Sequence, residues 1–164
     1  MAPGGLVSIF GNNLAVTNAS ASTPLPFSLA GTSVTFNGVP AALLYVSAGQ
    51  INAQVPAEML APSGSITAAS VIVTTAAGPS APMQAGVAIQ SPGFFSMDGS
   101  GCGQAAALNT TEFFTSVNGP ANSAAPGDYV TLFGTGFGSW GPTQPPDGVA
   151  ATQAANVGGV FSMD

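Results

Sequence analysis

Apolar residues recur along the chain in short runs that glycine and proline interrupt. Leu6–Phe10 is an apolar run, and Ile51–Val55 alternates between apolar and polar positions. Ser65–Thr75 contains a β-branched run, and Met83–Ile89 closes the series. Such runs, repeated at intervals of about 8–12 residues, predict the strands of a β-sandwich. We therefore expect an all-β fold, in which only Ala57–Ala61 suits a single helical turn.

A hairpin is predicted between residues 33 and 46. Ser33–Phe36 alternates, Asn37-Gly38 follows it, and Ala42–Val46 is a second strand-like run. Asn-Gly is typical of a type I′ turn, because both of its residues tolerate positive φ. We expect Ala42–Val46 to be the strand that returns from this turn.

One segment occurs twice. Ala2–Ala15 reads APGGLVSIFGNNLA, and Ala125–Gly138, which starts 123 residues later, reads APGDYVTLFGTGFG. An internal repeat of this kind indicates two copies of one domain type. We expect a first sandwich over residues 1–90, a connector over 91–124 and the start of a second, incomplete sandwich over 125–164.

Four segments resemble the uncharacterised repeat domains found in secreted proteins of Acidobacteria of the Solibacter type. They are APGGLVSIFGNNLA, SVTFNGVPAALLYVS, GQINAQVP and the connector SPGFFSMDGSGCGQAAALN. Those repeats are themselves similar to IPT/TIG immunoglobulin-like domains. The resemblance spans most of residues 1–148, and GQINAQVP is its most specific part. It implies a bacterial extracellular protein of tandem immunoglobulin-like sandwiches, and it implies no catalytic residues.

Charge is scarce in this chain, and all of it is negative. The sequence has no Lys, Arg or His, and its net charge is −6. Without cations the chain cannot replace phosphate counterions, which argues against nucleic acid as a partner. It also lacks an apolar run of about 18 residues, so we expect no membrane insertion. The small charge leaves little repulsion between copies and favours self-association.

The residues that most catalytic sites require are missing. A Ser or Cys nucleophile needs a base such as His, and a zinc site needs several Cys and His residues. The chain has no His and one cysteine, Cys102, which we expect to be a half-buried residue in a Gly-rich turn. The alternative is an intermolecular disulfide or a reactive thiol. We therefore expect a non-enzymatic protein without a cofactor. Calcium is an alternative ligand for loop residues Asp98 and Asp147, but such aspartates also form turns by bonding nearby backbone.

Aromatic residues outside the expected core are candidates for contacts between domains or subunits. Alternation places Val7 and Ile9 on the core face, so Phe10 and its counterpart Phe133 should face outward. Phenylalanines in a free linker would leave large apolar areas in water, so the connector pairs should also be packed. The candidate interface residues are Phe10, Phe94, Phe95, Phe113, Phe114, Phe133, Trp140 and Phe161.

Two functions remain open from the sequence. The first is a self-associating structural protein, such as the subunit of a filament or surface layer, because an incomplete sandwich exposes an edge that a neighbouring copy can pair. The second is an adhesion or glycan-binding module of a larger surface protein. The candidates for contact with an extracellular polysaccharide are Trp140, Tyr129 and Tyr45, of which Trp140 is the best. Either protein would act outside the cell or at its surface, and Asn18 and Asn109 begin N-x-S/T patterns typical of glycosylation.

Overall fold

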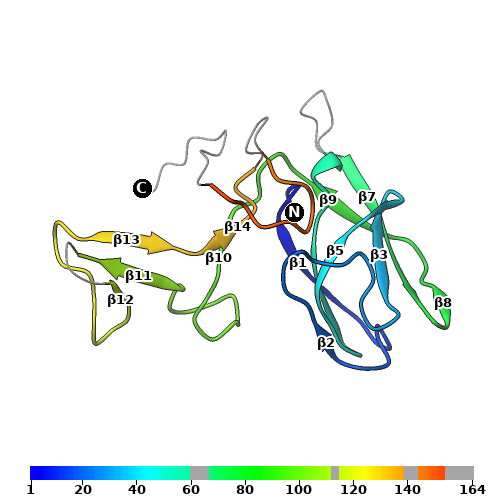
Figure 1. The fold of residues 1–164 in the computed structure, drawn as a ribbon, viewed down its shortest axis with the longest axis horizontal. Coiled ribbons are helices and arrows are strands. Elements are labelled where there is room, and N and C mark those ends of the chain that lie inside the picture. Colours follow the sequence, from blue (N-terminus) through cyan, green and yellow to red (C-terminus); the bar gives the residue numbers. More distant parts are fainter. Residues whose placement is uncertain (60–66, 112–114, 139–143, 154–164) are drawn as a thin grey trace. The chain divides into compact units, whose positions relative to one another are not determined.

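In the computed structural model of this chain, the described residues form strands, connecting loops and one short 3-10 turn. The residues that it describes are 1–59, 67–111, 115–138 and 144–153. They divide into two compact units, which Figure 1 shows as ribbons. Unit 1 consists of Met1–Ser91 and the described residues from Gly136 onward, and unit 2 consists of Pro92–Thr135. The prediction of an all-β fold is confirmed.

Unit 1 contains two antiparallel sheets. The strands of the first sheet are β1 (Leu6–Phe10), β2 (Ala19–Ser20), β5 (Ala42–Val46) and β6 (Gln50–Gln54). They lie in the order β1-β6-β5-β2. The strands of the second sheet are β3 (Ser33–Phe36), β4 (Val39–Pro40), β7 (Thr67–Thr75), β8 (Gly78–Pro79) and β9 (Met83–Val87). They lie in the order β4-β3-β7-β8, and β9 also pairs with β7.

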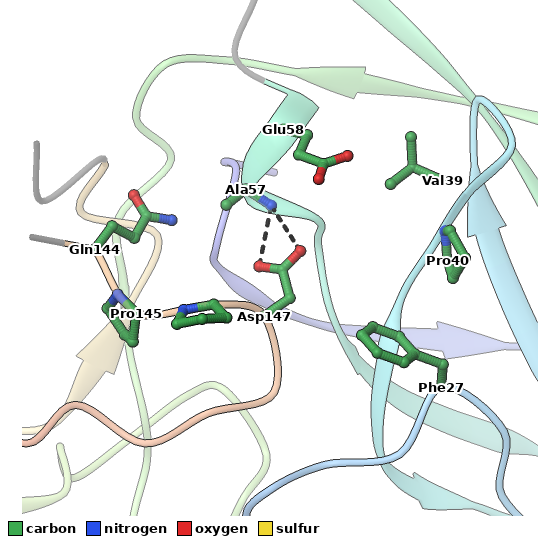
Figure 2. A pocket seen from close by; sticks show the side chains of 9 residues that line it. Phe27, Val39, Pro40, Ala57, Glu58, Gln144, Pro145 and Asp147 are labelled. Atoms are coloured by element: carbon green, nitrogen blue, oxygen red, sulfur yellow. Dashed lines mark hydrogen bonds between the residues drawn. The ribbon is translucent and has the colours of Figure 1, made fainter. Parts of the chain in front are cut away.

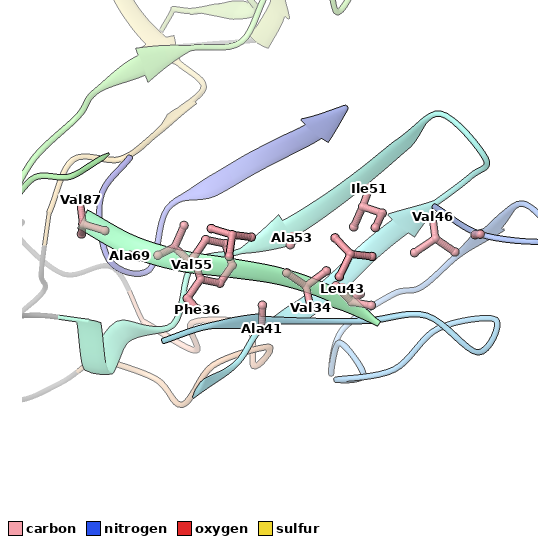
Figure 3. Packing of buried hydrophobic residues seen from close by; sticks show 13 residues of the cluster. Val34, Phe36, Ala41, Leu43, Val46, Ile51, Ala53, Val55, Ala69 and Val87 are labelled. Carbon is pink, nitrogen blue, oxygen red and sulfur yellow. The ribbon is translucent and has the colours of Figure 1, made fainter. Parts of the chain in front are cut away.

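The two sheets of unit 1 share one hydrophobic core. In β6 the side chains of Ile51 and Ala53 are fully buried, as their alternation predicted. Val34 and Phe36 of β3 belong to the same cluster, and Figure 3 shows them reaching between the strands toward the first sheet. Each large apolar side chain buried in this way stabilises the fold by about 1.5–3 kcal/mol. Two antiparallel sheets around one core are consistent with a β-sandwich.

The Asn37-Gly38 turn forms as predicted, but the predicted return strand is wrong. Both residues have positive φ, 50° and 83°, and β3 pairs with β4 across the turn, as in a type I′ hairpin. The expected return strand, β5, instead pairs with β6 and β2 in the other sheet. The fully buried Ala41 and Ala42 carry the chain from one sheet to the other. The Asn-Gly signal fixes the turn type but not the length of the strand after it.

Unit 2 contains five short strands where the sequence predicted mainly a connector. The strands are β10 (Gly93–Phe94), β11 (Ala107–Thr110), β12 (Thr115–Val117), β13 (Tyr129–Leu132) and β14 (Gly134–Thr135). One sheet has the order β12-β11-β13, and β10 pairs with β14. The unit boundaries therefore differ from the expected ones, since residues 125–135 group with the connector and residues 136–153 group with the first unit.

The two copies of the repeat form the same local structure. The N–H of Gly5 donates to the carbonyl oxygen of Ala2, and the N–H of Asp128 donates to that of Ala125, both at 3.0 Å. The glycine before each donor has a positive φ, 72° in the first copy and 99° in the second. Proline followed by such a glycine is typical of a type II turn. The two copies of the repeat therefore share a turn type and a following strand as well as a similar sequence.

Candidate functional site

Residues 146–149 form a turn that lies on unit 1. The N–H of Val149 donates to the carbonyl oxygen of Pro146 at 3.1 Å, and Gly148 has a φ of 77°. The N–H of Gly148 donates to Oε1 of Gln54 at 2.7 Å, and its carbonyl oxygen accepts the N–H of Leu25 at 2.8 Å. A Cβ at Gly148 would lie 2.7 Å from the Leu25 oxygen, so this contact requires glycine.

Asp147 holds the same turn at a second point. Its two carboxylate oxygens accept the N–H of Ala57 at 3.2 and 3.1 Å, at the start of the 3-10 turn η1 (Ala57–Met59) (Figure 2). Burial raises the pKa of Asp147, the Ala57 hydrogen bond acts in the opposite direction, and repulsion from Glu58 adds to the increase. Asp147 therefore caps a short helix that lies 90 residues away in the sequence.

A pocket of about 550 Å³ opens beside this contact. Figure 2 shows Phe27 and Pro40 on one side of it and Pro145 on the other, with the carboxylates of Glu58 and Asp147 between them. Calcium prefers six to eight oxygen ligands, and the described residues hold no group of three His, Cys, Asp or Glu that could bind a metal ion. The Asp147 oxygens already accept the N–H of Ala57. We therefore infer that Asp147 keeps the turn at residues 146–149 in place.

Asp98 lies in a tight loop of unit 2. Its Oδ1 accepts the backbone N–H and the hydroxyl of Ser100 at 3.0 and 2.7 Å. These bonds favour the charged form and lower the pKa of Asp98 to about 2. Asp98 is therefore a turn former, which is the alternative that the sequence left open. Cys102 follows in the same loop and is exposed, so the expectation of half burial is wrong.

The candidate interface residues that the structure describes lie at the surface. Phe10 is 74% exposed, while Val7 and Ile9 pack against the core of unit 1, as their alternation predicted. Phe133, the counterpart of Phe10, is 45% exposed in unit 2. Phe94 and Phe95 are exposed to a similar degree. The remaining candidates lie outside the described residues; they are Phe113, Phe114, Trp140 and Phe161.

Two exposed residues of β13 are missing from the predicted interface. Tyr129 is 79% exposed, and Val130 is 46% exposed although its counterpart Val7 packs against a core. The repeat aligns Val130 with Val7, so the sequence predicts a core-facing residue there. The repeat alone does not reveal that Val130 is exposed, because burial depends on the elements packed against a strand. Tyr129 is among the aromatic residues that the sequence offers for glycan contact.

The Asn109 glycosylation pattern falls on a buried residue. Asn109 is 4% exposed, and its Nδ2 donates to the carbonyl oxygen of Asn122 at 2.8 Å. Its Oδ1 accepts the side-chain amide of Asn118 at 2.7 Å. Both ends of the amide are therefore used inside unit 2, and the folded chain does not offer Asn109 for modification. Asn18 is exposed, and its modification stays a prediction.

Comparison of the chain with protein-family models gave no match. Searches of the curated proteins and of the solved structures also gave no match. Among the described residues, no helix has the length and apolar character needed to cross a membrane. Any function proposed for this chain therefore rests on its sequence and on the geometry of its described residues.

Proposed function

We propose that this chain is a non-enzymatic extracellular structural protein whose copies associate through strand edges and aromatic side chains. In this proposal it is the subunit of a filament or a surface layer. Its domains are of the IPT/TIG immunoglobulin-like class, and residues 125–164 begin a second such domain. The observation that carries the proposal is the apolar surface that β13 exposes.

β13 exposes apolar side chains at the surface of unit 2. Tyr129 and Val130 point apolar area into water, whereas Val7 and Ile9 of β1 contact the core of unit 1. Burial of a large apolar side chain is favourable by about 1.5–3 kcal/mol, which an isolated unit 2 does not gain at these positions. Because successive residues of a strand alternate, Tyr129 and Val130 expose apolar area on opposite faces of β13, and exposed apolar area of this kind is typical of interaction sites. Contact with a second copy would bury them.

The charge of the chain supports the same proposal. Six carboxylates and no Lys, Arg or His leave copies with weak mutual repulsion at neutral pH. Raising the pH through about 4 ionises carboxylates and adds only negative charge. We therefore expect self-association to weaken modestly from pH 3 to pH 7, as light scattering can measure. Association that strengthens over this range without added divalent metal would show that charge repulsion is not the governing interaction.

The proposal is tested by electron microscopy and light scattering of the purified chain over a range of concentrations. We expect regular filaments or sheets, and we expect the double variant Phe94→Ser, Phe95→Ser to assemble less while unit 1 stays folded. Phe27→Ser is the matched control, since Phe27 is an exposed phenylalanine of unit 1. A wild-type chain that stays monomeric at every concentration contradicts the proposed function.

A further inference from the structure

β1 and β13 are two copies of one strand, and each lies at the edge of its sheet. Along an antiparallel strand, every second residue directs its N–H and C=O groups to one neighbour, and the residues between direct theirs to the opposite edge. The parity of the residues that bond a neighbour therefore shows which edge of each strand is filled.

In β1 the odd-numbered residues face β6. The carbonyl oxygen of Gly5 and the N–H of Gly11 make hydrogen bonds of 2.8 and 3.2 Å to the residues that flank β6, and the register between them is unbroken. Ser8 and Phe10 therefore direct their backbone groups to the other edge. In the described part of the chain no strand pairs with that edge.

In β13 the odd-numbered residues face β11. The N–H of Phe133 donates to the carbonyl oxygen of Ala106 at 3.0 Å, in register with the pairing of β13 and β11. Val130 and Leu132 therefore direct their backbone groups away from β11. Since Phe133 is the counterpart of Phe10, β11 lies on the edge that is open in β1. Correspondingly, β6 lies on the edge that is open in β13.

The repeat strand thus accepts a neighbour on either edge, and each copy has a different edge filled. Natural sheets protect open edges with proline, lysine or β-bulges. β1 and β13 contain neither proline nor lysine, and their registers show no bulge. At Ser8 and Phe10 of β1 and at Val130 and Leu132 of β13, the open edges are therefore competent for pairing, and one chain carries one of each.

We propose that the open edge of β1, at Ser8 and Phe10, pairs with the open edge of β13, at Val130 and Leu132, in a second copy of this chain. The inference rests on the proposed function and names the contact through which copies associate. The two edges differ, so the contact is head-to-tail and can be repeated without limit when the rotation between copies does not close a ring. The joined sheet would contain seven strands in the order β12-β11-β13-β1-β6-β5-β2.

Proline substitution tests each edge separately. Ser8→Pro and Val130→Pro each remove one open-edge N–H and leave the backbone hydrogen bonds to β6 or β11 in place. Ser8→Pro also removes the bond from the Ser8 hydroxyl to Oδ1 of Asn52, and its control Ser8→Ala removes the same bond. We expect each variant to need a concentration about tenfold higher, or more, for assembly, because one or more hydrogen bonds are lost and the edge is obstructed. Ser8→Ala and Val130→Thr keep the N–H and are the matched controls. Proline variants that are folded by circular dichroism and assemble as well as these controls contradict the pairing.

A mixture of the two proline variants gives the sharper result. Ser8→Pro retains the β13 edge, and Val130→Pro retains the β1 edge, so an equimolar mixture should form dimers that cannot extend. At concentrations below those at which either variant assembles alone, light scattering should report twice the monomer mass for the mixture and the monomer mass for each variant by itself. Folded variants that remain monomeric when mixed contradict the proposal.

Hydrogen exchange tests the contact without any substitution. In the assembled wild-type chain, the amides of Ser8, Phe10, Val130 and Leu132 should exchange more slowly than in the dilute monomer. The amide of Ile9 faces β6 in both states and serves as the internal control. Assembly without this slowing contradicts the edge pairing and leaves the proposed function standing. A wild-type chain that does not assemble contradicts both.

Discussion

β1 and β13 show what one strand sequence becomes in two surroundings. Both follow the same type II turn and both pair with one antiparallel neighbour. In unit 1 the neighbour places Ile51 beside Ile9, and a second sheet covers both. In unit 2 the neighbour places Ala107 beside Leu132, and Val130 remains nearly half exposed. Local sequence therefore determines the turn and the strand, whereas burial depends on elements distant in the sequence.

The two units also differ in what stabilises them. Unit 1 has an apolar cluster to which both sheets contribute, whereas the described part of unit 2 has one buried apolar residue, Ala107. Unit 2 depends instead on side-chain amides, with Asn109 bonded to Asn118 and Asn122. Apolar burial tolerates small shifts of geometry, but a hydrogen-bonded network loses stability whenever one member is left unpaired. Substitutions should therefore affect the two units by different mechanisms.

The largest effect is expected in the core of unit 1. Phe36→Ala removes a fully buried aromatic side chain and should lower the free energy of unfolding by about 3–5 kcal/mol. Phe10→Ala removes the same group from an exposed position and should change it by less than about 1 kcal/mol. Urea unfolding followed by circular dichroism measures both. Equal losses would contradict the assignment of Phe10 to the surface.

The next effect is expected in the amide network of unit 2. Asn109→Ala leaves the Asn118 amide without its partner, removes one of the two hydrogen bonds to the Asn122 carbonyl oxygen and should destabilise unit 2 by about 1–3 kcal/mol. Hydrogen exchange should rise in β11 and β12 and stay unchanged in β5 and β6. Asn12→Ala, at an exposed asparagine, is the control. A loss of protection that spreads into unit 1 would show that the two units do not unfold independently.

Features of local origin were predictable from the sequence. The Asn37-Gly38 turn needs only two residues that tolerate positive φ, and the burial of Ile51 and Ala53 follows from period-two alternation. The strand at Tyr129–Phe133 was predicted and forms as β13. β11 and β12 were missed because they are short and largely polar, so they lack the apolar alternation that marks β6. The assignment of β5 to its sheet failed because a turn signal carries no information about the neighbours of the next strand.

The contact between Asp147 and Ala57 was not predictable either. The two residues are 90 positions apart, and the sequence around Asp147 contains only a Pro-Pro-Asp-Gly turn signal. That signal predicts a turn and an aspartate that bonds nearby backbone. The structure shows the turn, but the carboxylate bonds a distant backbone N–H. A local motif therefore predicted the shape of this segment without predicting what it binds.

The third prediction concerns the chain after each copy of the repeat. After β1 the chain continues within unit 1, whereas after β13 and β14 it passes from unit 2 into unit 1, where Gly148 bonds Gln54 and Leu25. Gly148→Ala should destabilise that contact by about 1–2 kcal/mol from backbone strain alone, and more from the clash with the Leu25 oxygen. The Leu25 amide should then exchange faster.

Gly31→Ala is the matched control for this substitution. Gly31 has a φ of 76°, nearly that of Gly148, but its Cβ would meet nothing within 4 Å. Gly31→Ala should therefore show the backbone strain without the clash, and the Leu25 amide should keep its protection. Equal effects of the two variants would mean that the turn at residues 146–149 is not held on unit 1 in solution.

The smallest effect concerns pH and has opposite signs in the two units. The pKa of Asp147 is raised above its ordinary value of 3.8, so the folded chain holds this proton more tightly than the unfolded chain. Its contribution to stability is fully present below pH 3.8 and is lost as the pH rises through the raised pKa. Asp147→Asn cannot titrate but keeps an oxygen for the Ala57 N–H. We expect the wild type to gain stability relative to Asp147→Asn as the pH falls from 7 to 3, and solvent screening of this partly exposed carboxyl should keep the gain small.

The contribution of Asp98 to stability should depend on pH in the opposite direction. Its pKa is lowered to about 2, so its contribution is present above pH 3.8 and is lost as the pH falls toward 2. Asp98 is fully exposed, so the effect should be confined to its own loop and weakened by salt. Exchange of the Ser100 amide, compared between the wild type and Asp98→Asn, should therefore rise in the wild type at low pH. Urea midpoints of the Asp147 pair should move the other way over the same range. If both pairs moved in the same direction, burial would not be the dominant influence on Asp147, and the turn at residues 146–149 would be more open to water than its contacts indicate.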